Sequence, residues 1–84
     1  MTPTQYLVME VLAARWRLGF DYWTFPGDHP AYLKAIRALS LLGYIGYEHR
    51  DCNGNWLVGL SEQGIKAWKL DERMTYAYRN RAPQ

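Results

Sequence analysis

The chain has 84 residues, a formal net charge of +2 and a hydrophobic fraction of 49%, which suits one small domain. Four Trp and seven Tyr can supply a core, and the single cysteine, Cys52, excludes an intrachain disulfide framework. No apolar run approaches the roughly 18 residues that cross a bilayer, and the first ten residues lack the pattern of a signal peptide. We therefore expect a cytoplasmic protein.

The N-terminal segment carries the signals that begin and end a helix. Thr2 can cap, Pro3 suits the first helical position, and Gln5 completes a capping box. The apolar side chains that recur at helical spacing are Leu7, Val8, Val11, Ala14 and Leu18. Gly19 is a suitable stop, so we predict a helix over about residues 3–18.

Residues 20–30, FDYWTFPGDHP, combine four aromatic side chains with two prolines and a glycine. The aromatic run favours strand geometry and Pro26-Gly27 favours a turn, so a short third strand is possible near residues 21–25. We expect these rings to fill the core, and a stacking platform for nucleic-acid bases is the alternative.

The segment over residues 30–42, PAYLKAIRALSLL, predicts an amphipathic helix that Asp28 can cap. Projected at 100° per residue, five apolar side chains share one face, whereas Lys34, Arg37 and Leu41 lie opposite. The five inner residues are Tyr32, Ala35, Ile36, Leu39 and Leu42.

A β-hairpin is predicted next, with strands over residues 44–50 and 56–60. Asn53-Gly54 lies between these runs and favours a type I′ turn, in which both central residues have positive φ. The hairpin leads directly into Ser61, which is a good helix cap.

The last predicted helix extends from about residue 62 to residue 77. Its apolar side chains are Ile65, Ala67, Trp68, Leu70, Met74 and Ala77. We therefore expect a single domain over residues 1–78 and a basic, flexible tail over residues 79–84.

Two motifs follow one another between the second predicted helix and the last one. The first consists of Leu39, Gly43, Tyr44 and Ile45, and the second of Leu60, Ser61, Glu62 and Gly64. This segment resembles winged helix-turn-helix domains of the MarR and PadR kind, whose recognition helix ends with a Leu, three residues, a Gly and two apolar residues. In those families a hairpin wing and an LT-E-x-G helix start follow. The WTFP motif over residues 23–26 is similar to small winged-helix proteins of actinobacterial phages.

The resemblance implies an α+β winged helix with three helices and a two-stranded hairpin wing, acting as a DNA-binding transcription regulator. The recognition helix, about residues 30–42, would enter the major groove, and the wing, about residues 44–60, would approach the backbone. The candidate DNA-binding residues are Lys34, Arg37, His49, Arg50, Asn53 and Asn55. Only residues 19–29 separate the first helix from the recognition helix, so the supporting helix is expected to be short or missing.

Partners follow from the same resemblance. A homodimer through the first and last helices is implied, with Trp68, Met74, Tyr76 and Tyr78 as candidate contacts, and Arg79 and Arg81 could add contacts to DNA. The alternative is a protein-interaction module without DNA binding, such as a phage protein that engages a host factor through Leu33 and Leu41. In the simplest interpretation, Lys34 and Arg37 are only the solvated side of a helix.

The sequence offers little for catalysis. His49 and Cys52 lie at a hairpin tip, where a strand-to-turn path does not fix their relative geometry. The only other histidine, His29, is remote in sequence, and a structural zinc site needs four ligands. Asp51 and Glu48 would repel phosphate from the hairpin. We expect no enzymatic activity, no metal and no cofactor.

Overall fold

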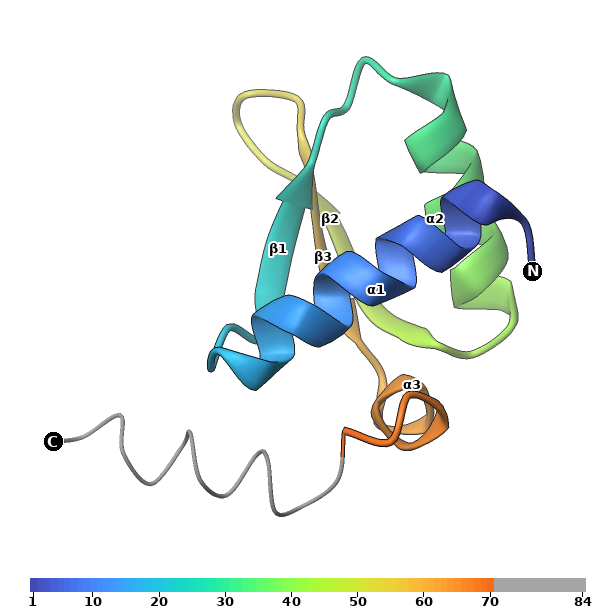
Figure 1. Cartoon of the computed structure of the whole chain (residues 1–84). Coiled ribbons are helices and arrows are strands. Elements are labelled where there is room, and N and C mark those ends of the chain that lie inside the picture. Colours follow the sequence, from blue (N-terminus) through green and yellow to red (C-terminus); the bar gives the residue numbers. More distant parts are fainter. Residues whose placement is uncertain (71–84) are drawn as a thin grey trace, which may run out of the picture.

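The computed structural model describes residues 1–70 of the chain. The elements are α1 (Pro3–Arg17), β1 (Tyr22–Phe25), α2 (Pro30–Leu41), β2 (Ile45–Arg50), β3 (Trp56–Leu60) and α3 (Glu62–Ala67). Within this range they form an α+β fold of three helices and a three-stranded antiparallel sheet (Figure 1). The predicted boundary between domain and tail lies outside the described residues. So do the candidate contacts Met74, Tyr76, Tyr78, Arg79 and Arg81.

The sheet has the strand order β1-β3-β2, with β3 in the centre and antiparallel to both neighbours. The short strand expected near residues 21–25 is therefore confirmed as β1. Figure 1 shows α1 lying across one face of the sheet, with α2 beside it and α3 near one end of the sheet. None of the described helices has the length and apolarity needed to cross a membrane.

One hydrophobic core joins α1 and α2 to that face of the sheet. Its buried members are Val8, Met9, Leu12, Phe25, Ala35, Ile36, Leu39, Ile45 and Val58. Burial of a large aliphatic or aromatic side chain contributes about 1.5–3 kcal/mol, so this cluster is the main source of stability. The inner face predicted for α2 is confirmed at Ala35, Ile36 and Leu39, while Leu42 is 52% exposed.

The apolar stripe predicted for α1 is mostly on the wrong side of the helix. Leu7 and Leu18 are 48% and 56% exposed, whereas the buried residues of α1 are Val8, Met9, Leu12 and Ala13. The spacing of the apolar residues could not predict which stripe faces the core, because α1 is apolar on both sides. The inward one is the stripe that packs against α2 and the sheet.

Both predicted helix starts can be compared with the structure. At α1 the capping box is present, because the Gln5 amide donates to the Thr2 hydroxyl at 3.2 Å and the Thr2 amide donates to the Gln5 side chain at 3.3 Å. At α2 the prediction of an Asp28 cap is wrong. The N-cap is His29, which makes no side-chain capping bond, so Asp28 lies one residue too early to cap.

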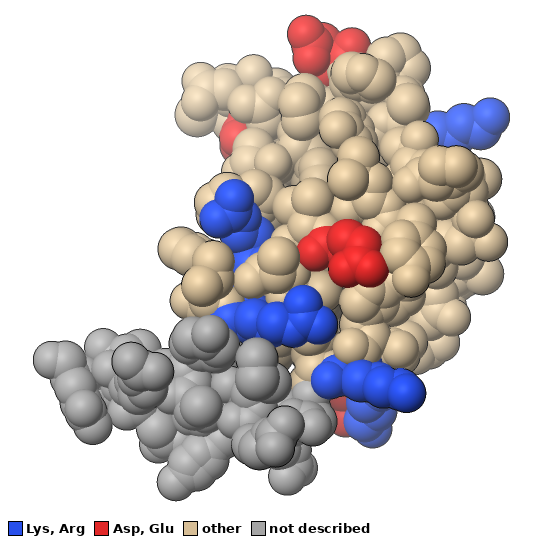
Figure 2. Space-filling model, in the orientation of Figure 1, with Lys and Arg blue, Asp and Glu red and all other residues tan. Residues whose placement is uncertain are grey.

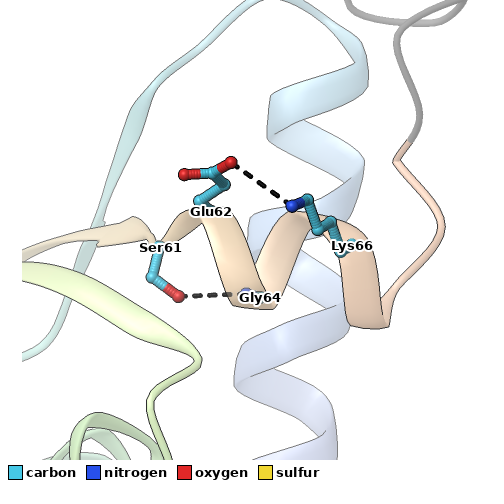
Figure 3. Close-up of polar contacts among 4 residues, drawn as sticks. All are labelled: Ser61, Glu62, Gly64 and Lys66. Carbon is cyan, nitrogen blue, oxygen red and sulfur yellow. Dashed lines mark hydrogen bonds and ion pairs between the residues drawn. The ribbon is translucent and has the colours of Figure 1, made fainter.

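The prediction of one continuous helix over residues 62–77 is wrong at residues 68–70, and its part over residues 71–77 lies outside the described residues. The helix ends at Ala67, Trp68 is its C-cap, and Lys69 adopts a left-handed φ of 55°. The Leu70 amide donates to the Ile65 carbonyl at 2.9 Å, which completes a Schellman motif, and the Leu70 side chain is buried. At the start of α3, the Ser61 hydroxyl accepts from the Gly64 amide at 3.0 Å, as predicted (Figure 3).

Candidate nucleic-acid interface

The hairpin between β2 and β3 has a tight tip, but the turn is not the predicted type I′. Only Gly54 has a positive φ (81°) there, and Asn53 does not. The Gly54 amide donates to the Asp51 carbonyl at 3.1 Å, and the Asp51 amide donates to the Asn55 carbonyl at 2.8 Å. This pattern fits a three-residue loop that ends in a left-handed glycine. The Asp51 carboxylate favours it by accepting from the amides of Asn53 and Asn55, each at 2.9 Å.

The hairpin tip is held against the loop that leads into α2. The Gly27 amide donates to the Asn55 side-chain oxygen at 3.3 Å. The two backbones approach so closely that a Cβ added at Gly27 would lie 1.6 Å from the Gly54 carbonyl oxygen. Asn55, a predicted contact residue, is thus half-buried with its acceptor engaged, and it positions the hairpin relative to the start of α2.

The exposed side of α2 carries Lys34, Arg37 and Leu41 on successive turns, as the helical projection predicts. Leu41 is 91% exposed. Glu62 and Lys66 of α3 form an ion pair at 3.3 Å (Figure 3), whereas neither Lys34 nor Arg37 has a carboxylate partner within 4.0 Å among residues 1–70. Both cations are therefore free to attract an anion.

Arg37 nevertheless has an acidic neighbour. It lines a shallow depression of about 300 Å³ with Ser40, Leu41 and Glu48, and the Ser40 hydroxyl donates to the Glu48 carboxylate at 3.0 Å. This carboxylate comes from β2, and periodicity along α2 gives no indication of it. Lys34 instead borders Thr2, Thr4 and Gln5 at the start of α1, where no acidic side chain lines the surface. Lys34 therefore has the more favourable surroundings for a phosphate.

The two basic candidate residues of β2, His49 and Arg50, point to opposite faces of the sheet. Arg50 pairs with Trp56 and His49 pairs with Leu57, and neighbouring residues of a strand point to opposite faces. The Arg50 guanidinium lies 5.5 Å from the Trp56 ring centroid, and its Nε donates to the Gly54 carbonyl at 3.2 Å. Arg50 is thus fixed at the hairpin tip near the exposed Asn53, whereas His49 lies on the face of the sheet away from the helices.

The remaining surface is electrically mixed. Figure 2 shows the face that carries α1, where charged side chains of both signs are dispersed and several basic groups lie low, near α3. Trp68, a predicted dimer contact, packs between Tyr6 and Tyr44, with ring centroids 5.6 and 6.3 Å away. Among residues 1–70 no three His, Cys, Asp or Glu side chains are grouped to hold a metal ion, and Cys52 is an exposed free thiol.

No protein-family model matches the chain, and the searches of curated proteins and of solved structures gave no significant match. Function is therefore inferred from the residues described above. These residues present a helix whose cations have no ion-pair partner in residues 1–70, beside a hairpin tip whose position is fixed.

Proposed function

We propose that the chain is a DNA-binding protein of the winged-helix type, with α2 as the recognition helix and the β2–β3 hairpin as the wing. The observation that supports this most is the pair Lys34 and Arg37, which lie one turn apart on the exposed side of α2 without an ion-pair partner in residues 1–70. The hydrogen bond between Gly27 and Asn55 also supports the proposal, because it would hold helix and wing together as one rigid unit when they contact a ligand.

In this function α2 lies in the major groove, as recognition helices do. Lys34 contacts a phosphate or a guanine edge, and Arg37 does the same after its surroundings near Glu48 reorganise. Arg50 and Asn53 at the wing tip approach the adjacent backbone. Residues 26–29 contain no helix, so α2 is supported by α1 rather than by an additional helix. A transcriptional role is the natural use of such a protein.

The proposal predicts weak, salt-sensitive binding. Three or four phosphate contacts correspond to a log–log salt slope of about −3 to −4. We expect fluorescence anisotropy with random-sequence duplex DNA to show binding at 50 mM salt. We expect a Lys34→Ala, Arg37→Ala double variant to bind less tightly and to lose about 2 units of the slope, because each phosphate contact contributes about 0.9.

A matched control removes two positive charges elsewhere. Lys66→Ala with Lys69→Asn changes two exposed residues of the α3 region, and asparagine tolerates the left-handed φ of residue 69. This control should keep the parent salt slope. Absence of parent binding at 50 mM salt would refute the DNA proposal, and equal loss in both double variants would show that net charge, not α2, governs binding.

A protein-binding role is the second candidate, and one observation favours it. Leu41 is 91% exposed in the middle of the surface that DNA would occupy, beside Glu48, and apolar anchors of this kind suit a protein partner. The two functions differ at this residue. Leu41→Ser should leave DNA binding intact under the first function, whereas it should abolish complex formation under the second.

A further inference from the structure

A carboxylate from β2 lies beside the cations of α2. Glu48 pairs with Val58, whose side chain is buried in the core, so Glu48 points to the side of the sheet that carries the helices. Its Oε2 accepts from the Ser40 hydroxyl at 3.0 Å. Both residues line a shallow depression with Arg37, although Arg37 has no carboxylate within 4.0 Å among residues 1–70. The carboxylate is therefore held by a hydrogen bond from Ser40 and not by an ion pair.

This carboxylate is unfavourable on a surface that binds only phosphate. A negative charge beside Arg37 repels the DNA backbone and lowers the positive potential that attracts it. Base edges are different, because the major groove displays hydrogen-bond donors as well as acceptors. Cytosine presents its N4 amino group there, and a Glu or Asp side chain can accept from it. Ser40 engages Oε2 of Glu48, so Oε1 is left to accept from such a donor.

We propose that Glu48 is a specificity-determining residue of the DNA interface, an inference that rests on the function proposed above. Arg37 binds the O6 and N7 acceptors of a guanine, and Glu48 binds the N4 amino group of a cytosine. Because the two side chains line one depression, the two bases belong to neighbouring base pairs. Ser40 is a positioning residue, since it acts only through the carboxylate that it holds.

The two cations of α2 then have different tasks. Lys34 borders the start of α1, where no acidic side chain lines the surface. It is suited to a phosphate, and phosphate contacts carry no sequence information. Arg37 shares its depression with the carboxylate, which disfavours a phosphate there. Loss of Lys34 should therefore weaken binding to every duplex alike, whereas a change at Glu48 should alter which duplexes are preferred.

Glu48→Gln tests the charge while it retains the shape of the side chain. The amide oxygen of glutamine can still accept from Ser40, so the fold should persist by circular dichroism. Duplexes are selected from a random-sequence library at about 50 mM salt with the parent and with the variant, and are then sequenced. The parent should enrich a guanine and a neighbouring cytosine, with cytosine preferred at least about fivefold over other bases at its position.

The variant should differ from the parent in two ways. Its preference at the cytosine position should shift towards adenine, which glutamine recognises through N6 and N7. It should also bind unselected random duplex more tightly in fluorescence anisotropy, because a repulsive charge is lost. Glu62→Gln is the matched charge control, since it removes one negative charge from an exposed residue of α3, and it should keep the parent preference.

Substitutions at Ser40 test the positioning role. Ser40→Ala should weaken the preference for cytosine, whereas Ser40→Thr retains the hydroxyl and should keep it. If the hydrogen bond between Ser40 and Glu48 only joined α2 to β2, Ser40→Ala would lower Tm without changing the bases selected.

The outcomes separate this inference from the proposed function. It would be overturned by a parent that binds duplex DNA without a preferred cytosine, or by a Glu48→Gln variant that keeps the parent preference or binds unselected duplex more weakly. The proposed function would stand in each of these cases. A parent that binds no duplex at about 50 mM salt would refute both.

Discussion

Replacement of Gly64 by alanine should destabilise the protein, although alanine is the better helix former. Helix propensity alone favours the change by up to about 1 kcal/mol. A Cβ at residue 64, however, would lie 2.2 Å from the carbonyl oxygen of Tyr44, whereas real Cβ contacts essentially never fall below 3.0 Å. The helix must therefore retreat by about 0.8 Å (3.0 − 2.2 Å). Overpacking of this kind costs about 1–3 kcal/mol.

That retreat has a second cost at the start of α3 (Figure 3). The Tyr44 carbonyl accepts the Ser61 amide at 3.0 Å, and displacement of the helix weakens this bond, which contributes about 1 kcal/mol. Together with the overpacking and the gain in propensity, the net loss is about 2 kcal/mol, or a fall in Tm of roughly 8–16 °C.

Thermal and urea unfolding followed by circular dichroism measure this loss. Lys66→Ala in the same helix is the matched control, because Lys66 is exposed and its ion pair with Glu62 has little effect on stability. The control should stay within about 0.5 kcal/mol of the parent. A Gly64→Ala protein as stable as the parent would show that α3 does not pack on Tyr44 as described.

Three further substitutions test other contacts. Ser61→Ala removes the helix cap and the hydroxyl that donates to the Gly43 carbonyl, so urea unfolding should show a loss of about 1–2 kcal/mol, and no loss would contradict the cap. Asn55→Ala leaves the Gly27 amide without its acceptor; we expect faster hydrogen exchange at that amide and a loss of about 1 kcal/mol, and unchanged exchange would count against the hairpin anchor. Leu41→Ser should leave Tm unchanged, because the side chain is 91% exposed, and a large fall would mean that Leu41 is covered.

The helix ends show what the sequence can and cannot predict. The first two helices each end in a Schellman motif with a glycine, Gly19 or Gly43, at the left-handed position, and both ends were predicted to within one residue. The third helix ends in the same way at Lys69, where no glycine indicates a stop. Burial of Leu70 accompanies the left-handed turn, and such a tertiary contact leaves no local pattern.

The candidate interface likewise has features that the sequence could predict and features that it could not. The exposure of Lys34 and Arg37 could be predicted because the small and apolar residues Ala35, Ile36 and Leu39 share one face of α2, which fixes the orientation of the helix on the core. The neighbours that alter the surroundings of the candidate residues come from other elements of the fold. Glu48 approaches α2 from β2, and Gly27 meets Asn55 across two loops, so neither contact is visible in the spacing of one segment.

A pair of tyrosine rings on the face of the sheet away from the helices can report whether the strands remain paired. Tyr22 of β1 and Tyr47 of β2 flank Gly59 of the central strand, and their rings meet at 4.8 Å. A Cβ at residue 59 would lie 2.7 Å from the Tyr22 ring, so the glycine makes room for this pair. Because the rings belong to opposite edge strands, detachment of either edge separates them. Their coupled near-ultraviolet dichroism therefore offers a direct optical signal for fraying of the sheet, distinct from melting of the helices.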